Sequence, residues 1–191
     1  MAKVASHYAD LYQWTAPSDI PGIQNARQFF RAIGIDPTKR RPSSEALLQR
    51  AIKKKDLYTI NTLVDVGNWC SLEFLLPTCV YDADNIRGDV TLRLGAPGET
   101  YLALNNRDME FEGRFVLADD NGPFGSPMTD AARTAVSTDT TNALLGIWAP
   151  LSFDSDTLRH HAETFAQRAI DYCGGTVFSI EYLSARPSPQ R

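Results

Sequence analysis

The chain has 191 residues, of which 43% are hydrophobic and 22% are charged, and this is the ordinary composition of a globular protein. At roughly 150 residues per domain the length favours one domain, and a chain of this size buries about 70% of its unfolded surface without needing disulfides or a metal. The formal net charge of −4 argues against a protein that coats nucleic acid through its overall field.

The cysteines and the apolar runs bear on location and partners. Cys70, Cys79 and Cys173 are scattered, which is typical of reduced thiols, so we expect a cytoplasmic protein. No apolar run approaches the roughly 18 residues of a membrane span, so we expect no membrane partner. We expect no cofactor and no metal, because the sequence lacks a dinucleotide fingerprint, a phosphate-binding loop and a paired-histidine zinc motif.

The patterning divides the chain into three parts. Residues 1–24 are weakly patterned and are interpreted as a short helix or an arm. Residues 25–184 hold the strongly periodic segments and are predicted to form one domain. Residues 185–191 are predicted to be a disordered tail.

Helices are predicted early in this domain. One covers 25–33, and a second begins near Ser43, whose hydroxyl is expected to accept a hydrogen bond from first-turn amides. Glu45 lies in the first turn of the second helix, where the macrodipole favours an acid.

A longer helix is predicted from about residue 60 to Pro77. Beside its apolar stripe runs a polar one, formed by Asn61, Asp65 and Asn68 at spacings of three and four. These side chains either belong to a site or satisfy backbone groups at helix and strand ends.

The middle of the chain changes to a two-residue period, which predicts strands. Residues 89–94 and 100–104 flank a turn and are predicted to form a hairpin. Residues 143–149 are apolar on both faces, so we expect a central strand there. The remaining predicted elements are strands at 111–119, 134–138 and 176–182 and a helix at 155–173. The class is therefore α+β with a mixed or antiparallel sheet, flanked by helices.

A basic segment and three tryptophans are further candidates. Seven cations fall between residues 39 and 55. They either complement a helix C-terminus or form an anion-binding patch. The tryptophans are expected in or near the core, because each buries a large area. The cations are Lys39, Arg40, Arg41, Arg50, Lys53, Lys54 and Lys55, and the tryptophans are Trp14, Trp69 and Trp148.

Several motifs together resemble a known module. They are Arg41-Pro42-Ser43-Ser44-Glu45-Ala46-Leu47-Leu48, Ile60 to Asp65 with Asn68, Tyr81-Asp82-Ala83-Asp84, and Gly88 to Arg93 with Gly98-Glu99. Between about Arg27 and Ala149 the chain is similar to the tRNA-binding and editing module of the bacterial phenylalanyl-tRNA synthetase β-subunit, the B3/B4 domain. More closely, it resembles free-standing proteins built from that module alone.

The resemblance implies an α+β fold whose sheets enclose a pocket, and in the synthetase that pocket hydrolyses tyrosine mischarged onto tRNA. The family's histidine matches Cys79 here, its glycine-rich loop falls near 126–130, and its glutamate matches Gly146, so tyrosine specificity is not transferred. The candidate pocket residues are Asn61, Cys79, Tyr81, Arg93, Ser126, Asp130, Thr138 and Gly146. The candidate RNA-binding residues are Arg40, Arg41, Arg50, Lys53, Lys54 and Lys55.

Three functions are compatible with these residues. The first is a module that binds tRNA or its charged 3′ end, and the second is a trans-acting deacylase that removes a wrong amino acid from tRNA. The third is a protein that binds a small, amino-acid-like molecule and no RNA, which the acidic isoelectric point near 5.3 favours. Whether the chain is an enzyme is left open by the sequence, and no catalytic residue is assigned.

Overall fold

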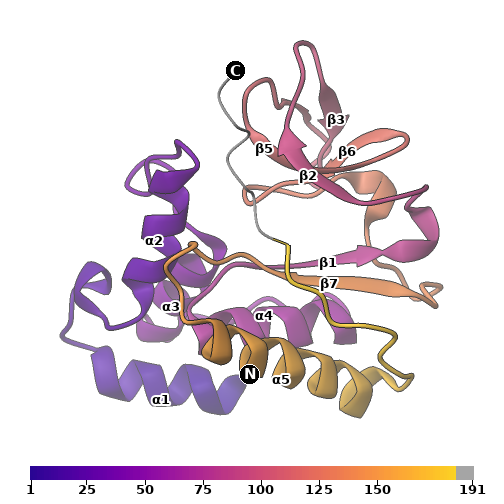
Figure 1. Ribbon diagram of the computed structural model, residues 1–191. Helices are drawn as coiled ribbons and strands as arrows, with labels where there is room; N and C mark the ends of the chain where they lie inside the picture. The colour runs from indigo at the N-terminus through magenta and orange to yellow at the C-terminus, as the bar shows by residue number, and fades with distance from the viewer. Residues whose placement is uncertain (184–191) are drawn as a thin grey trace.

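In this α+β fold a two-stranded antiparallel sheet lies between a layer of helices and a β-rich half (Figure 1). The β-rich half contains the strands between residues 91 and 125. The structure is a computed structural model, and it describes residues 1–183. Its helices are α1 (Ala2–Tyr12), α2 (Ile23–Ala32), α3 (Ser43–Ile52), α4 (Thr62–Phe74) and α5 (Ser155–Cys173). Its strands are β1 (Thr78–Asp82), β2 (Thr91–Leu94), β3 (Thr100–Leu102), β4 (Asp108–Glu110), β5 (Phe115–Asp119), β6 (Gly122–Gly125) and β7 (Ala143–Ile147). The predicted α+β class with antiparallel sheets is confirmed.

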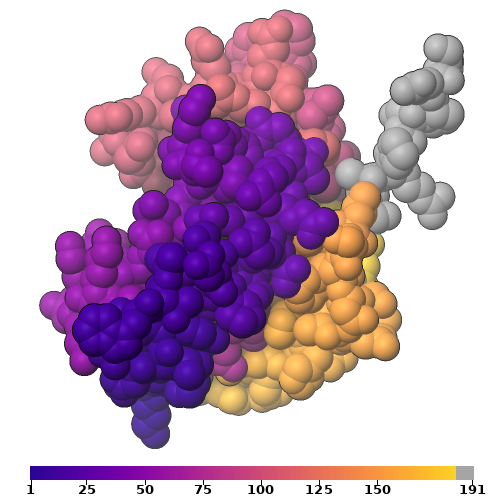
Figure 2. Space-filling view, turned by 90° about the vertical axis from the view of Figure 1, so that its left-hand side faces the viewer, coloured from indigo at the N-terminus to yellow at the C-terminus, as the bar shows by residue number. Residues whose placement is uncertain are grey.

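The helical layer is built around α4. On one side its Cys70 and Phe74 pack with Phe165 of α5, and on the other Leu72 belongs to a cluster with residues of α3. At the N-terminus α1 is formed, and its Tyr8 hydroxyl donates to the backbone carbonyl of Glu73 at 3.2 Å. Figure 2 shows the N-terminal helices covering one side of the molecule, between the β-rich half and α5.

A buried ion pair joins α2 to α3. Glu45 is fully buried, and the guanidinium of Arg27 donates to both of its carboxylate oxygens at 2.7 Å. Arg41 lies 3.4 Å from the same carboxylate, and the Gln49 amide donates to it at 3.3 Å. The expected cap by Ser43 is wrong: Pro42 occupies the N-cap position and no side chain caps this helix.

The sheet of β1 and β7 has two covered faces. Because neighbouring residues on a strand point to opposite faces, Val80 of β1 and Leu145 of β7 pack on the helices. Cys79 and Tyr81 point instead into the β-rich half. The apolar pattern of β7 is thus explained by cover on both faces, but its predicted central position is wrong. Within residues 1–183 it pairs with β1 alone.

In the β-rich half the predicted hairpin is wrong. The turn between β2 and β3 forms, but β2 pairs with β5 and β3 pairs with β4. Instead of a hairpin ladder, a side-chain pair closes the turn: the guanidinium of Arg93 donates to both oxygens of Glu99 at 2.6 Å. The register of β2 is fixed by long-range contacts with β5 and not by the turn that follows it.

Two other predicted strands are absent from the described residues. Residues 132–134 form a short 3-10 helix, and residues 135–140 continue without strand pairing. Residues 176–182 have no strand partner, and their side chains are exposed. The α5 prediction is confirmed, and Asp154 caps it by accepting from the Thr157 backbone N–H at 2.8 Å. The predicted disordered tail lies outside the described residues.

Candidate functional site

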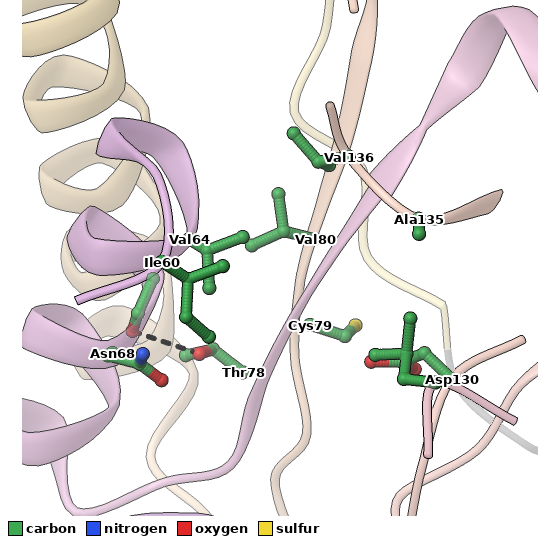
Figure 3. Close-up of a pocket in the computed structure, with 11 residues that line it drawn as sticks. Ile60, Val64, Asn68, Thr78, Cys79, Val80, Asp130, Ala135 and Val136 are labelled. Carbon is green, nitrogen blue, oxygen red and sulfur yellow. Dashed lines mark hydrogen bonds between the residues drawn. The ribbon is translucent and has the colours of Figure 1, made fainter. Parts of the chain in front are cut away.

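A cleft of about 190 Å³ opens between the start of α4, the edge of β1 and the segment that follows the 3-10 helix at 132–134. Figure 3 shows Ile60, Val64 and Asn68 on one wall, with Cys79 and Asp130 across from them. Most of the lining is apolar. The residues that line it are Ile60, Val64, Gly67, Asn68, Thr78, Cys79, Val80, Leu104, Asp130, Ala135 and Val136.

Local sequence fixes the wall formed by α4. Asn61 caps the helix by accepting from the Val64 backbone N–H at 2.9 Å, and its amide donates to the carbonyl of Val136 at 3.4 Å. The capping residue therefore ties the start of α4 to the segment that follows the 3-10 helix, so it joins two walls of the cleft. Asp65 accepts from the backbone N–H of Ile60 at 2.9 Å, which holds the residue before the cap in place. Of the two alternatives for Asn61 and Asp65, satisfying backbone groups is the role that the structure shows.

A glycine on α4 lets β1 approach closely. A Cβ on Gly67 would lie 2.9 Å from a methyl carbon of Val80, so a larger residue would push the strand away. The Thr78 hydroxyl donates to the Gly67 carbonyl at 3.0 Å, which holds β1 in this position (Figure 3). The floor of the cleft is set by this contact.

A second cavity, of about 80 Å³, shares Thr78, Cys79 and Asp130 with the cleft. It extends toward the N-terminus of α3 and toward Trp148, whose ring stacks on that of Phe29 at a centroid distance of 5.8 Å. Its other lining residues are Ser43, Ser126, Pro127, Met128 and Thr129. The shared residues form the junction of the two cavities.

Asp130 dominates the electrostatics of this junction. Burial raises the pKa of its carboxyl to about 6, although the Tyr81 hydroxyl donates to Oδ1 at 2.6 Å and opposes the rise. Burial also raises the pKa of the Cys79 thiol well above its ordinary value, so this thiol is neutral at neutral pH. Among the described residues that line the two cavities, Asp130 alone is charged at neutral pH.

Ser126 is engaged in holding its own loop. Its hydroxyl donates to the Thr129 carbonyl at 2.8 Å and accepts from the backbone N–H groups of Met128 and Thr129 at 3.2 and 3.1 Å. The Tyr101 hydroxyl also donates to the Thr129 carbonyl, at 2.6 Å. These bonds shape the loop that carries Asp130, so Ser126 positions the site and is not free to act as a nucleophile.

Cys79 and Gly146 form a complementary pair. They lie opposite each other in the β1–β7 register, and a Cβ at position 146 would lie only 2.6 Å from the Cys79 sulfur. The thiol thus occupies the volume that a side chain at 146 would need. The two positions that the resemblance matches to the family's histidine and glutamate are therefore in direct contact.

Of the eight candidate pocket residues, the structure brings Cys79, Ser126 and Asp130 to the cavity walls. Asn61, Tyr81 and Gly146 are not lining residues, but each contacts one: Asn61 bonds to Val64, Tyr81 bonds to Asp130, and Gly146 lies against Cys79. Arg93 lies outside both cavities and pairs with Glu99, and Thr138 is an exposed turn residue that lines neither. Sequence reasoning missed Thr78, Ala135, Val136 and Trp148, since their roles depend on contacts between segments distant in the chain.

The candidate RNA-binding residues fall into two groups at opposite ends of α3. Arg40 and Arg41 precede this ten-residue helix and Lys53 to Lys55 follow it, so about 15 Å of helix separates them. Arg41 is paired with Glu45, and Arg50 bonds to the loop after the helix. The lysines are exposed. The candidates are thus divided between the two ends of the helix.

Comparison with known protein families shows which family the chain belongs to. The family model described as the B3/4 domain matches residues 25–171. The chain belongs to the B3/4 domain family. The family match begins within α2, ends within α5 and includes the residues that line both cavities, and the resemblance expected from the sequence motifs is confirmed.

Relatives of this B3/4 domain include phenylalanine–tRNA ligase β subunits. The Psychrobacter arcticus subunit is 32% identical over 155 residues, which cover 76% of this chain and 19% of the relative. The Ralstonia nicotianae subunit is 29% identical over 153 residues with the same coverage. The Brucella abortus strain 2308 subunit is 40% identical over 90 residues, which cover 47% of this chain and 11% of the relative. The chain therefore spans between a tenth and a fifth of their length.

Within residues 1–183, none of the helices has the length and hydrophobicity needed to cross a membrane.

Proposed function

We propose that this B3/4 domain binds a tRNA and receives the aminoacyl group of a charged 3′ end in the cleft beside Asp130. One observation carries the proposal: a mostly apolar cleft contains a single group that is charged at neutral pH, the carboxylate of Asp130. An aminoacyl group has a matching composition, with one α-ammonium cation and a side chain. The names of the three relatives described above, each a phenylalanine–tRNA ligase β subunit, support the choice of a tRNA as the carrier.

The ligand's orientation follows from this match. Oδ1 of Asp130 accepts from Tyr81, which leaves Oδ2 to accept from the α-ammonium. The amino-acid side chain would then lie against Ile60, Val64 and Val136. The cleft of about 190 Å³ is smaller than the 300–1,000 Å³ or so of a drug-sized ligand site, which fits one amino-acid side chain and not a whole nucleotide.

The finer proposal is hydrolysis of the aminoacyl ester. Water would attack the ester carbonyl, the bond to the ribose oxygen would break, and the products would be a free amino acid and a tRNA with its terminal hydroxyl restored. The contribution of the domain would be orientation: Asp130 holds the ammonium while Asn68 and Thr78 offer hydrogen bonds to water at the cleft wall.

Two assays test these proposals. In filter binding to total tRNA across a salt series, saturable binding that weakens with salt is expected. In a deacylation assay on a panel of mischarged tRNAs, at least one ester should be lost faster than in buffer. No binding even at low salt would contradict the RNA proposal. Stable esters throughout would contradict hydrolysis and leave the binding proposal in place.

A small amino-acid-like ligand without RNA is the second candidate. The net charge of −4 and the separation of the basic residues to the two ends of α3 favour it. The test is a thermal-shift measurement against free amino acids. A rise in melting temperature for one of them, combined with no tRNA binding at low salt, would favour this candidate over the first.

A further inference from the structure

The loop between α3 and the cleft presents an aromatic ring to solvent. Tyr58 is 60% exposed, and the guanidinium carbon of Arg50 lies 4.1 Å from the centre of its ring. The same guanidinium donates to the Tyr58 hydroxyl at 3.0 Å. The ring is therefore held in a fixed position while much of it stays in contact with water.

The backbone around this ring is also fixed. Nε of Arg50 donates to the Asp56 carbonyl at 3.0 Å, and a second guanidinium nitrogen donates to the same oxygen. Two residues after Tyr58, the N–H of Ile60 is held by Asp65. The pair of Tyr58 and Arg50 is consequently anchored at both ends of a short segment.

This segment joins a group of cations to the cleft. Lys53, Lys54 and Lys55 are exposed just before it, and Ile60 at its end lines the cleft. The Cα atoms of residues 58 and 60 can be separated by at most about 7 Å. The local charge is positive, since these lysines and Arg50 outnumber Asp56 and Asp65.

We infer that Tyr58, stacked on Arg50, is a binding platform for the unpaired nucleobase next to the aminoacyl group, with Lys53 to Lys55 facing the phosphates. An exposed aromatic ring beside cations is how proteins bind single-stranded nucleic acid, because every base offers a π face for stacking. This inference rests on the proposed function. It assigns to the base a site that is separate from the cleft that receives the amino acid.

The test uses an RNA hairpin with an unpaired 3′ end whose last base is 2-aminopurine, a fluorescent base that is quenched by stacking. Wild-type protein should bind it and quench it. Tyr58→Ala should bind roughly tenfold more weakly, since stacking on an aromatic ring contributes about that much or more per base, and should lose most of the quenching. Tyr58→Phe should retain both, because it keeps the ring and loses only the hydroxyl.

Salt dependence separates stacking from charge. The slope of log affinity against log salt should be the same for Tyr58→Ala as for wild type, because no ionic contact is removed. Trp14→Ala is the matched control: Trp14 is an aromatic residue at the end of α1 that is 91% exposed, contrary to its predicted place in the core, and its loss should change neither binding nor quenching.

The two failures are distinguishable. If Tyr58→Ala binds and quenches the RNA as wild type does, the platform is refuted and the proposed function stands. If the wild-type protein binds total tRNA at low salt but not the hairpin, the platform is refuted and the proposed function stands; if it binds neither, both fail. Circular dichroism of each variant shows that it is folded before it is scored.

Discussion

Asp130 is the residue at which stability and the proposed function are linked. Its folded-state pKa of about 6 lies above the value of about 3.9 expected in the unfolded chain, so the folded state binds the proton more tightly. Its contribution to stability is therefore present at low pH and is lost as pH rises from about 4 through 6. A carboxyl that lies in a cleft and destabilises the fold when it is ionised is typical of a functional group.

Asp130→Asn should remove this cost. We expect the variant to be more stable than wild type by about 1–3 kcal/mol at pH 7.5, and we expect the difference to shrink toward zero near pH 4. Urea unfolding at both pH values measures it. Equal stabilities at pH 7.5, or a difference that does not change with pH, would contradict the assignment.

The contact between Cys79 and Gly146 leads to a second residue-scale prediction. Gly146→Ala places a methyl group 2.6 Å from the Cys79 sulfur and should destabilise the fold by about 1–3 kcal/mol. Cys79→Ala provides the space, so the double variant should be more stable than the sum of the two single changes predicts. Strict additivity in this cycle would show that the two side chains are not competing for one volume.

Between elements, the buried Glu45 carboxylate joins α2 to α3. Arg27→Met leaves this fully buried charge without its bidentate partner and should cost about 3–5 kcal/mol of unfolding free energy. Arg41→Met is the control, because Arg41 is 47% exposed and 3.4 Å away, and it should cost under about 1 kcal/mol. Denaturant unfolding measures both variants. Similar losses of unfolding free energy in the two would show that burial does not determine how much the ion pair stabilises the fold.

The three lysines that follow α3 are predicted to contact tRNA phosphates. Changing Lys53, Lys54 and Lys55 together to Gln should weaken tRNA binding and reduce its salt slope, since each neutralised phosphate releases counterions. Filter binding across a salt series measures both. The charge-matched control changes three other cations to Gln: Lys3, Arg107 and Arg114. These three residues are exposed and line neither cavity. A slope that is unchanged by the lysine variant would remove these residues from the interface.

The helices could be predicted from sequence because their signals are local. The start of α5 at Asp154 and the cap at Asn61 depend on side chains that bond to backbone groups three residues away. Strand pairing is not local. The turn after β2 has the residues of a hairpin turn, yet β2 pairs with β5 because the core residues Val116 and Leu117 are supplied there.

At the scale of the whole molecule, the cleft is produced by packing between segments that are far apart in the sequence. Asp130 meets Cys79 across 51 positions, and Asn61 meets Val136 across 75. The family resemblance placed Cys79, Ser126 and Asp130 at a pocket, and the structure brings these three to the cavity walls. Arg93 and Thr138 could not be excluded from sequence, because the direction of each side chain depends on neighbours that only the folded chain supplies.

The whole molecule is acidic, so the tRNA affinity that we propose must come from a local surface and from the cleft itself. That requirement makes the aminoacyl group the decisive part of the ligand. If the cleft contributes no affinity, the few exposed cations near α3 would bind charged and uncharged tRNA equally.

The most direct test is therefore a comparison of two tRNAs. The charged one carries phenylalanine, tyrosine or alanine through an amide in place of the ester, which prevents hydrolysis, and the other is uncharged. Affinities are measured at pH 7.5 for wild type and Asp130→Asn. The account predicts that wild type prefers at least one charged tRNA and that the variant loses this preference while it still binds the uncharged tRNA. Equal affinity of the wild-type protein for charged and uncharged tRNA would contradict the account.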